Sequence, residues 1–214
     1  FDNDDIIIKE EQAGMKVLEY TSDLSVTPFS AQNAYFCSEM KVRKRQLAID
    51  LINTEYTLSS GSMHWSVGDV SAVSDVKGVG DFFGKAIKST VTKESTVKPK
   101  YKGVGTLLLE PTYKHIILED VSKWNGGIVL DDALFLACES KLEQNVVMRS
   151  NLSSAILGGE GLFNLKISGN GIVALESPVP KEELVLIELE NDTYKISDLC
   201  RRLLWLLFLK ERLR

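Results

Sequence analysis

The sequence predicts an all-β fold, a β-sandwich or barrel of consecutive β repeats, and three observations predict it. The segment KYKGVGTLLLE at 100–110 returns as KISGNGIVALE at 166–176, an offset of 66 residues that also separates Gly103 from Gly169. Short apolar runs alternate with polar residues between glycines, as they do in strands. The chain has 214 residues, of which 44% are hydrophobic, which is enough for one large core. Because each copy of a repeat must bury its apolar face against its neighbours, the repeat predicts a shared interior.

Alternation indicates strands on both sides of the first copy. Leu47, Ile49 and Leu51 share one face of a strand. Residues 55–65 contain a further pair of strands around a Ser-Gly turn, and 162–168 alternate between apolar and polar residues throughout. These runs predict short strands that each present one apolar face to the core.

The glycine pair in each copy predicts a sharp change of direction. The Asn-Gly of the second copy favours a type I′ turn, but Val104 stands in the matching place, and a β-branched residue resists a positive φ. The shared geometry is therefore a type II′ turn with Gly103 or Gly169 first, or a glycine bend within a long strand. The runs that follow, 106–109 and 172–175, are apolar on both faces and predict a two-sided interior.

One short helix near 79–88 is predicted to interrupt the strands. Its apolar residues recur at helical spacing and form a single stripe: Val79, Phe82, Phe83, Ala86 and Ile87. We interpret this helix as a lid on the mouth of the sandwich or barrel, with a partner-binding helix as the alternative. Phe82 and Phe83, together with Glu160, would then line a mouth for a small ligand.

The tail at 199–214 departs from the repeat. The offset requires an apolar strand at 199–203, but Arg201 and Arg202 stand there, and the tail carries five basic residues and one acid. The pattern predicts a basic amphipathic helix, whose Arg201, Arg202, Trp205 and Phe208 would contact an anionic membrane surface. The alternatives are a non-native end from a shifted reading frame, a disordered end, or a helix docked on the core. We therefore divide the chain into one all-β repeat domain, 1–198, and this tail.

Composition limits the compartment and the partners. The net charge of −5 and the isoelectric point near 5.2 argue against nonspecific nucleic-acid binding, so no DNA partner is expected. Cys37, Cys138 and Cys200 are odd in number and far apart, which is typical of free thiols in a reducing compartment. The longest apolar run, 203–209, is far shorter than the roughly 20 residues of a membrane-spanning helix. We expect a bacterial cytoplasmic location, with membrane association through the tail.

Three segments together carry a resemblance to a known family: SGSM at 60–63, DALFLA at 132–137 and GGEGLFNLKISGNGIVAL at 158–175. They resemble the "altered inheritance of mitochondria" biogenesis family, which has many bacterial members and was formerly a domain of unknown function. The resemblance covers residues 40–196. It implies stacked β repeats similar to the fold of the trp RNA-binding attenuation protein, with no catalytic residues to transfer. Mitochondrial members imply a link to inner-membrane organisation.

The residues that could carry chemistry have simpler explanations. His64 and His115 with Asp131 and Asp132 could hold a metal, but no close ligand spacing supports a site, so we expect none. Ser62 and His64 would share a strand face, yet strand alternation explains that spacing without a catalytic role. The two adjacent aspartates would face opposite ways on a strand, which favours a turn.

Two further motifs are weighed as binding sites. Gly78 and Gly80 precede the predicted helix but lack the other residues of a phosphate-binding loop, so we interpret them as turn glycines. The one internal basic cluster would be a nucleic-acid patch for RNA: Lys41, Arg43, Lys44 and Arg45. It lacks interleaved aromatic residues, and an edge strand protected by charge is the alternative.

The predicted function is a non-catalytic interaction or scaffold role without a cofactor. Exposed strand edges and repeat symmetry favour self-association and protein partners. A small-ligand-binding β module is the alternative, RNA binding is a weaker one, and we do not expect an enzyme.

Overall fold

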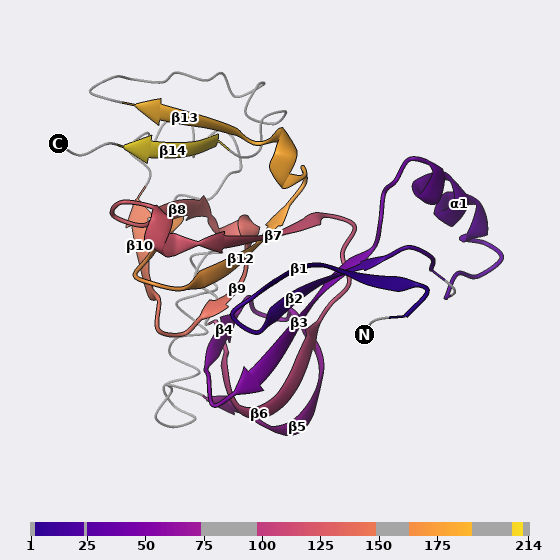
Figure 1. The fold of residues 1–214 in the computed structure, drawn as a ribbon, viewed down its shortest axis with the longest axis horizontal. Coiled ribbons are helices and arrows are strands. Elements are labelled where there is room, and N and C mark those ends of the chain that lie inside the picture. The colour runs from indigo at the N-terminus through magenta and orange to yellow at the C-terminus, as the bar shows by residue number, and fades with distance from the viewer. Residues whose placement is uncertain (1–2, 24, 74–97, 149–162, 190–206, 212–214) are drawn as a thin grey trace.

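The computed structural model describes residues 3–23, 25–73, 98–148, 163–189 and 207–211, most of which form strands (Figure 1). The main sheet has nine strands: β1 (Ile6–Gln12), β2 (Met15–Tyr20), β3 (Arg45–Ile52), β4 (Tyr56–Leu58), β5 (Met63–Val73), β6 (Lys100–Leu109), β7 (His115–Asp120), β9 (Phe135–Glu139) and β12 (Ile172–Ser177). Eight of them follow the order β1-β2-β3-β6-β4-β9-β12-β7, and β5 pairs with β6. The all-β class is thus confirmed.

The main sheet curves into a nearly closed antiparallel barrel. Every strand pairing within it is antiparallel. The last strand in the order, β7, returns to contact β1 and β3. An isolated bridge between Arg45 and Thr112 closes the gap with backbone hydrogen bonds of 2.7 and 2.8 Å. The barrel therefore brings the start of β3 next to the start of β7.

Smaller elements surround this sheet. A three-stranded antiparallel sheet has the order β10 (Glu143–Met148), β11 (Phe163–Ser168) and β8 (Ile128–Asp131). A parallel pair joins β13 (Val185–Leu189) to β14 (Leu207–Glu211). The helices are α1 (Ala31–Glu39) and the short 3-10 helices η1 (Val121–Lys123), η2 (Asp132–Leu134) and η3 (Lys181–Glu183). Within the described residues, no helix is long and apolar enough to cross a membrane.

The core forms on both faces of the central strands. Leu47, Ile49 and Leu51 of β3 belong to the largest buried cluster, as the alternation predicted. In β12, Ala174 joins that cluster, whereas Val173 joins a second cluster between the main sheet and the three-stranded sheet. The two-sided interior predicted for 106–109 and 172–175 is therefore confirmed for the three leucines of the first run and for all four residues of the second.

The repeated glycines do not form a hairpin turn. Gly103 lies inside the continuous strand β6, so the bend within a long strand is correct there. Gly169 lies between β11 and β12, which belong to different sheets and do not pair with each other. The type II′ alternative is wrong at both places, because Gly103 lies within one strand and the strands on either side of Gly169 do not pair with each other.

Three further expectations need correction. Strands β4 and β5 flank Gly61 as predicted, but each pairs with β6 rather than with the other. The basic cluster does not lie on an edge strand, because β3 has β2 on one side and β6 on the other. Residues 207–211 form strand β14 instead of a helix, because their backbone pairs in register with β13.

The single α-helix described is not the predicted one. Helix α1 follows Thr27 and Ser30, whose side chains and backbones hydrogen-bond to one another before the first turn. Its sequence AQNAYFCSE has no apolar stripe, so periodicity gave no signal for it. The predicted helix at 79–88 lies outside the described residues.

Candidate interaction site

The feature that leaves the barrel is the segment between β2 and β3, residues 21–44, which we call the arm. Figure 1 shows it extending from the ends of these strands and carrying α1 away from the sheets. None of the residues of α1 is buried. A helix with no buried face gains little stability from its own chain, which makes this segment unusual for a folded core.

One ion pair and a hydrogen bond join the two ends of the arm at its foot, beside Tyr20 of β2. Lys44 Nζ lies 2.8 Å from Asp23 Oδ2 and 4.9 Å from the centre of the Tyr20 ring. The hydrogen bonds from Lys44 and then Ser25 hold the pKa of Asp23 below its ordinary value. Arg43 Nη1 donates to Thr21 O at 2.6 Å. The arm therefore leaves the sheet in a defined direction.

Arg45, the first residue of β3, joins β3 to β2 where the arm ends. It is 6% exposed, and its Nε and Nη2 both lie 2.8 Å from Glu19 Oε2. Burial, and then the charge of Arg45, lower the pKa of the half-buried His115. The predicted basic cluster is thus divided, because Arg45 points into the protein while Lys41 is exposed on the arm.

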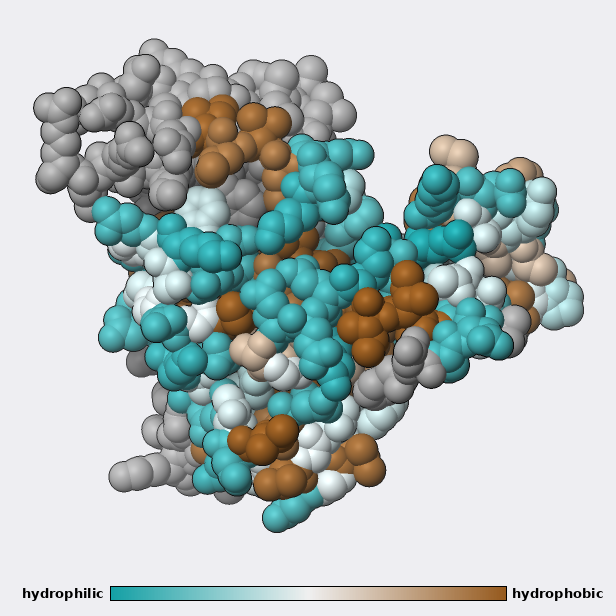
Figure 2. Space-filling view, viewed as in Figure 1, coloured by the Kyte–Doolittle hydropathy of each residue, from teal (hydrophilic) through white to brown (hydrophobic). Residues whose placement is uncertain are grey.

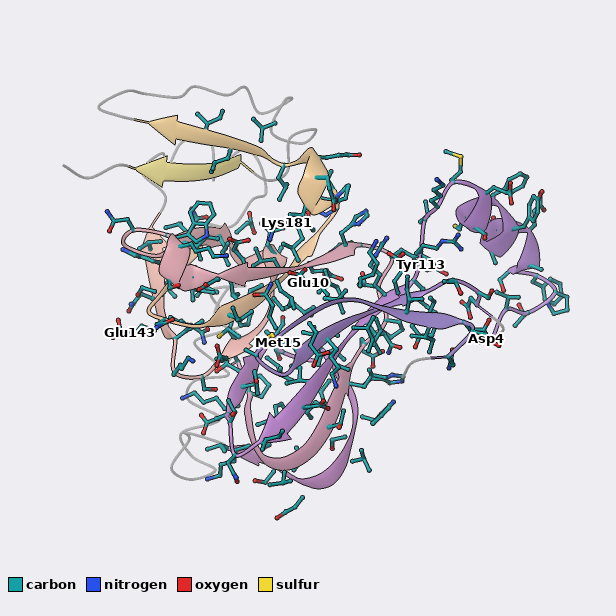
Figure 3. All side chains as sticks on the ribbon, viewed as in Figure 1. Asp4, Glu10, Met15, Tyr113, Glu143 and Lys181 are labelled. Carbon is teal, nitrogen blue, oxygen red and sulfur yellow. The ribbon has the colours of Figure 1, made fainter. Side chains whose placement is uncertain are left out.

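A pocket of about 290 Å³ lies between α1 and the foot of the arm. Tyr113 lies at this place in Figure 3. Aromatic rings and charged groups line the pocket, among them Tyr20, Asp23, Tyr35, Arg43, Lys44 and Tyr113. Because Asp23, Arg43 and Lys44 already bond within the protein, the pocket offers ring surface rather than an unpaired charge.

Large apolar side chains cover the outside of the arm. Phe29 is 97% exposed, Met40 76% and Phe36 55%. Figure 2 shows brown and tan residues gathered on the lobe at the right, where the arm lies. Exposed apolar groups in a cluster mark an interaction surface more often than single ones do.

A second apolar surface lies on the outer face of β3, β5 and β6. We call it the sheet patch: Ile52, Trp65, Val67 and Val104. Cross-strand partners share a face, and Val104 lies opposite both Ile52 and Asp69. Val67 lies opposite Thr106 on the same face of β6. Figure 2 shows apolar residues at the bottom of the molecule, over the bend of these strands.

The buried polar groups are occupied within the protein. Burial raises the pKa of Tyr56 to about 12, and its hydroxyl donates to Ala13 O. Burial also raises the pKa of the Cys138 thiol to about 12, which keeps it protonated and unreactive at neutral pH. Within the described residues, every buried side-chain nitrogen or oxygen has a hydrogen-bond partner. These groups stabilise the fold and leave no strained or unpaired centre.

The other residues weighed as sites lie apart from one another in the fold. His64 stands at a bulge at the start of β5, exposed, while Ser62 Oγ donates to Ser59 O before the strand begins. Asp131 ends β8 and accepts from Ala133 N, which confirms the predicted turn. No group of three potential metal ligands occurs in the described part of the chain.

Some of the residues predicted to form sites lie outside the described ranges. Phe82, Phe83 and Glu160 of the ligand mouth lie outside them, as do Cys200 and three residues of the membrane surface, Arg201, Arg202 and Trp205. Phe208 is part of β14. Cys37 and Cys138 are free thiols, as predicted.

Sequence reasoning missed the arm and the sheet patch. The arm contains Pro28-Phe29 and Tyr35-Phe36, aromatic residues in a polar stretch between two alternating strands. That contrast was the available signal, because a loop with aromatic residues and no apolar period has no core to join. The sheet patch had no signal, since Val67 and Val104 look like ordinary strand residues until pairing shows their shared outer face.

Three comparisons relate the chain to known proteins, and the match to a family model agrees with the resemblance seen in the sequence. A solved crystal structure of a Streptococcus pyogenes protein from a structural genomics consortium is 16% identical, covering 63% of this chain and 88% of that chain with a TM-score of 0.30. No match was found among curated proteins. The family model described as "Mitochondrial biogenesis AIM24" matches residues 39–200. Because this match spans most of the chain, the protein belongs to the mitochondrial biogenesis AIM24 family.

Proposed function

We propose that the protein is a non-catalytic scaffold that assembles with copies of itself through the edge of β5. The family is described by its association with mitochondrial biogenesis, and that description names no reaction. One observation carries the proposal, and it is the length and composition of this edge strand.

Strand β5 is eleven residues long and pairs with β6 along its whole length. On its other side, no strand of the described ranges pairs with it. Asp69 is its only acidic or basic residue apart from His64, and most of its side chains are exposed. A long edge with few charges presents free backbone donors and acceptors to another strand.

The edge at β1 shows how this chain protects a strand that stays unpaired. Among its seven residues, Lys9, Glu10 and Glu11 carry charges, and a bulge interrupts the pairing beside them. Charges and bulges are the usual devices against edge-to-edge pairing. Because β5 has one acid in eleven residues and its bulge only at the start, its edge is suited to pairing with a strand.

The occupant is a second copy of the chain. An exposed edge is always matched in length by the same edge of another copy, and a two-fold axis pairs them antiparallel. This arrangement pairs the free backbone groups of the β5 edge and leaves the barrel and the outer face of the sheet unchanged. It supports a scaffold whose building unit is a dimer.

The test is the molar mass of the purified chain by light scattering coupled to size exclusion. The edge variant, Ser66→Lys with Ala72→Lys, adds two exposed charges to β5 that a two-fold axis would bring together. We expect the wild type to exceed the monomer mass of 23.8 kDa and the edge variant to have a lower mass than the wild type.

The matched control is Asn125→Lys with Ala133→Lys, which adds the same charge at exposed sites between strands. It should keep the mass of the wild type. Circular dichroism and a thermal melt of each variant establish that a change of mass does not come from unfolding. A wild type that remains monomeric at high concentration, or an edge variant that associates as the wild type does, contradicts the proposal.

A further inference from the structure

We infer that the arm of one copy docks on the sheet patch of a second copy, forming a head-to-tail contact. This inference rests on the proposed self-association but uses other surfaces, the outer side of α1 and the outer face of β3, β5 and β6. The two surfaces lie at different ends of the molecule (Figure 1). The contact therefore joins two copies.

The arm has two sides with different roles. Ala31, Ala34, Tyr35 and Ser38, at helical spacing, line the pocket at its foot. Phe36 lies outside that set and, with Met40 one turn later, forms a row on the other side of the helix. Long apolar side chains at such spacing are the usual anchors of a helix on an apolar surface. The outer row is therefore the contact surface.

The sheet patch offers the complementary surface. Ile52 is 73% exposed, Val67 59% and Val104 55%, and the three lie on adjacent strands with one shared face. Small β-branched side chains on a sheet form a shallow apolar floor onto which larger aromatic rings can pack. Phe29 and Phe36 are rings of this kind, and both are exposed in the described part of the chain.

One pair of opposite charges sets the orientation of the arm on the sheet patch of the second copy. Lys41 follows Met40 on the arm, and Asp69 lies opposite Val104 on the sheet patch. Both are exposed, and neither forms an ion pair within the described residues. Placing Met40 over Val104 brings Lys41 beside Asp69, so one charge pair accompanies the apolar contact.

A second copy fits the arm better than a lipid surface does. The outer side of α1 carries Glu39 and no basic residue, and the whole chain has a net charge of −5. An anionic membrane would therefore gain little electrostatic attraction from this helix. The sheet patch carries an acid at the place where the arm carries its lysine.

Head-to-tail contacts can be tested by mixing, in the edge variant as background. The plug variant adds Phe29→Ser and Phe36→Ser, and the socket variant adds Ile52→Lys and Val104→Lys. Each alone lacks one of the two surfaces, so association should weaken by roughly tenfold or more, as expected for aromatic anchors. An equimolar mixture retains one intact plug and one intact socket, and we expect it to form a one-to-one dimer.

Each outcome decides between the two proposals. An edge variant that is monomeric before the new changes overturns the arm contact and leaves the β5 edge as the interface. An edge variant that associates to a lower mass than the wild type, and whose mixture of plug and socket variants gives the dimer, supports both contacts. An edge variant that keeps the wild-type mass overturns the edge. A mixture that stays monomeric overturns the arm contact. Liposome pelleting that the plug changes abolish, with no change in mass, overturns it in favour of a membrane.

The charge pair gives a second test in the same background. Lys41→Glu and Asp69→Lys each place like charges together and should weaken association, whereas the two changes combined restore the pair. Recovery in the double variant requires that the two residues meet across the contact. Failure to recover, with each variant folded by circular dichroism, contradicts the proposed orientation.

Discussion

The two copies of the repeated glycine segment have nearly the same pattern and yet form different structures. In the first copy, 100–110, the glycines lie within the unbroken strand β6. In the second, 166–176, strand β11 ends before them and β12 begins after them. Gly103 and Gly169 nevertheless share a positive φ, 132° and 114°. The local conformation is the same, so the difference comes from what lies next to it.

The neighbours of the first copy are backbone atoms. A Cβ at Gly103 would lie 1.9 Å from Asp69 O, and one at Gly105 would lie 2.2 Å from Val67 O. Strand β5 crosses so closely here that no side chain fits. In the second copy, a Cβ at Gly169 would meet the end of the Leu142 side chain at 3.3 Å. Gly103 is needed for space and for φ, whereas its counterpart Gly169 is needed chiefly for φ.

The same residue pattern therefore serves two purposes. Where a neighbouring strand passes at backbone distance, the glycines keep one long strand continuous and bent. Where no strand passes, they let the chain leave one sheet and enter another. A repeat in sequence predicts matching local conformations, but pairing partners decide whether the strand continues.

The largest expected effect comes from filling the first copy. We expect Gly103→Ala to destabilise the protein by about 3 kcal/mol or more, because it adds backbone overlap to the strain of a positive φ. Gly169→Ala bears the same φ strain next to a movable side chain, so about 1–2 kcal/mol is expected. Urea unfolding followed by circular dichroism measures both. Equal losses for the two variants would show that space at β5 does not matter.

The next effect concerns the hydrogen bond that fixes the start of β12, just after the glycines of the second copy. Glu139 Oε2 accepts from Ile172 N at 2.8 Å, and Oε1 lies 2.9 Å from Lys141 Nζ. This nearly buried carboxylate satisfies the first amide of β12, and Val73 stands at the matching place in the first copy. We expect Glu139→Ala to cost about 1–3 kcal/mol of unfolding free energy, because it leaves that amide unpaired.

Glu139→Gln is the control, since its side-chain oxygen retains the acceptor for Ile172 N while the charge is lost. It should lose less stability than the alanine variant in the same urea experiment. If the two variants lose equal stability, the ion pair with Lys141 matters more than the hydrogen bond to β12.

Much of the barrel was predictable because strands leave a period in the sequence. Leu47, Ile49 and Leu51 alternate, and their side chains are buried as expected. The pairing was not predictable, because β6 takes β3, β4 and β5 as partners from up to 60 residues away, as Ala48 and Leu108 show, and no local pattern records that choice. A glycine such as Gly103 indicates that another segment of backbone passes close by, but it does not indicate which strand that segment belongs to.

The candidate site was harder to predict than the core. The cluster at 41–45 was noticed for its charge, but its residues separate into a buried anchor, Arg45, and an exposed one, Lys41. The aromatic residues of the arm follow no period, and none of those in α1 is buried in the described part of the chain. The residues of a binding surface are selected to fit its partner, and the sequence of one chain alone does not show what that partner is.

The smallest expected effect is a change of stability with pH, and it concerns two positions at the repeat offset that lie outside the two copies. His115 of β7 stands 66 residues after Ile49 of β3, so a titratable group replaces an apolar one. Burial and the charge of Arg45 lower the pKa of His115 below 6.5, against the opposing charges of Glu19, Glu182 and Glu183. The unfolded chain therefore takes up this proton at a higher pH than the folded protein does. Stability is fully present above pH 6.5 and falls as the pH drops toward the folded value.

His115→Gln removes this proton uptake, so its unfolding free energy should fall less than that of the wild type between about pH 8 and about pH 5.5. Urea unfolding at both values measures the difference. The carboxylates titrate in both proteins and cancel from the comparison. If the wild type and the variant lose equal stability over this range, the pKa of His115 is the same in the folded and the unfolded protein, and the prediction is wrong.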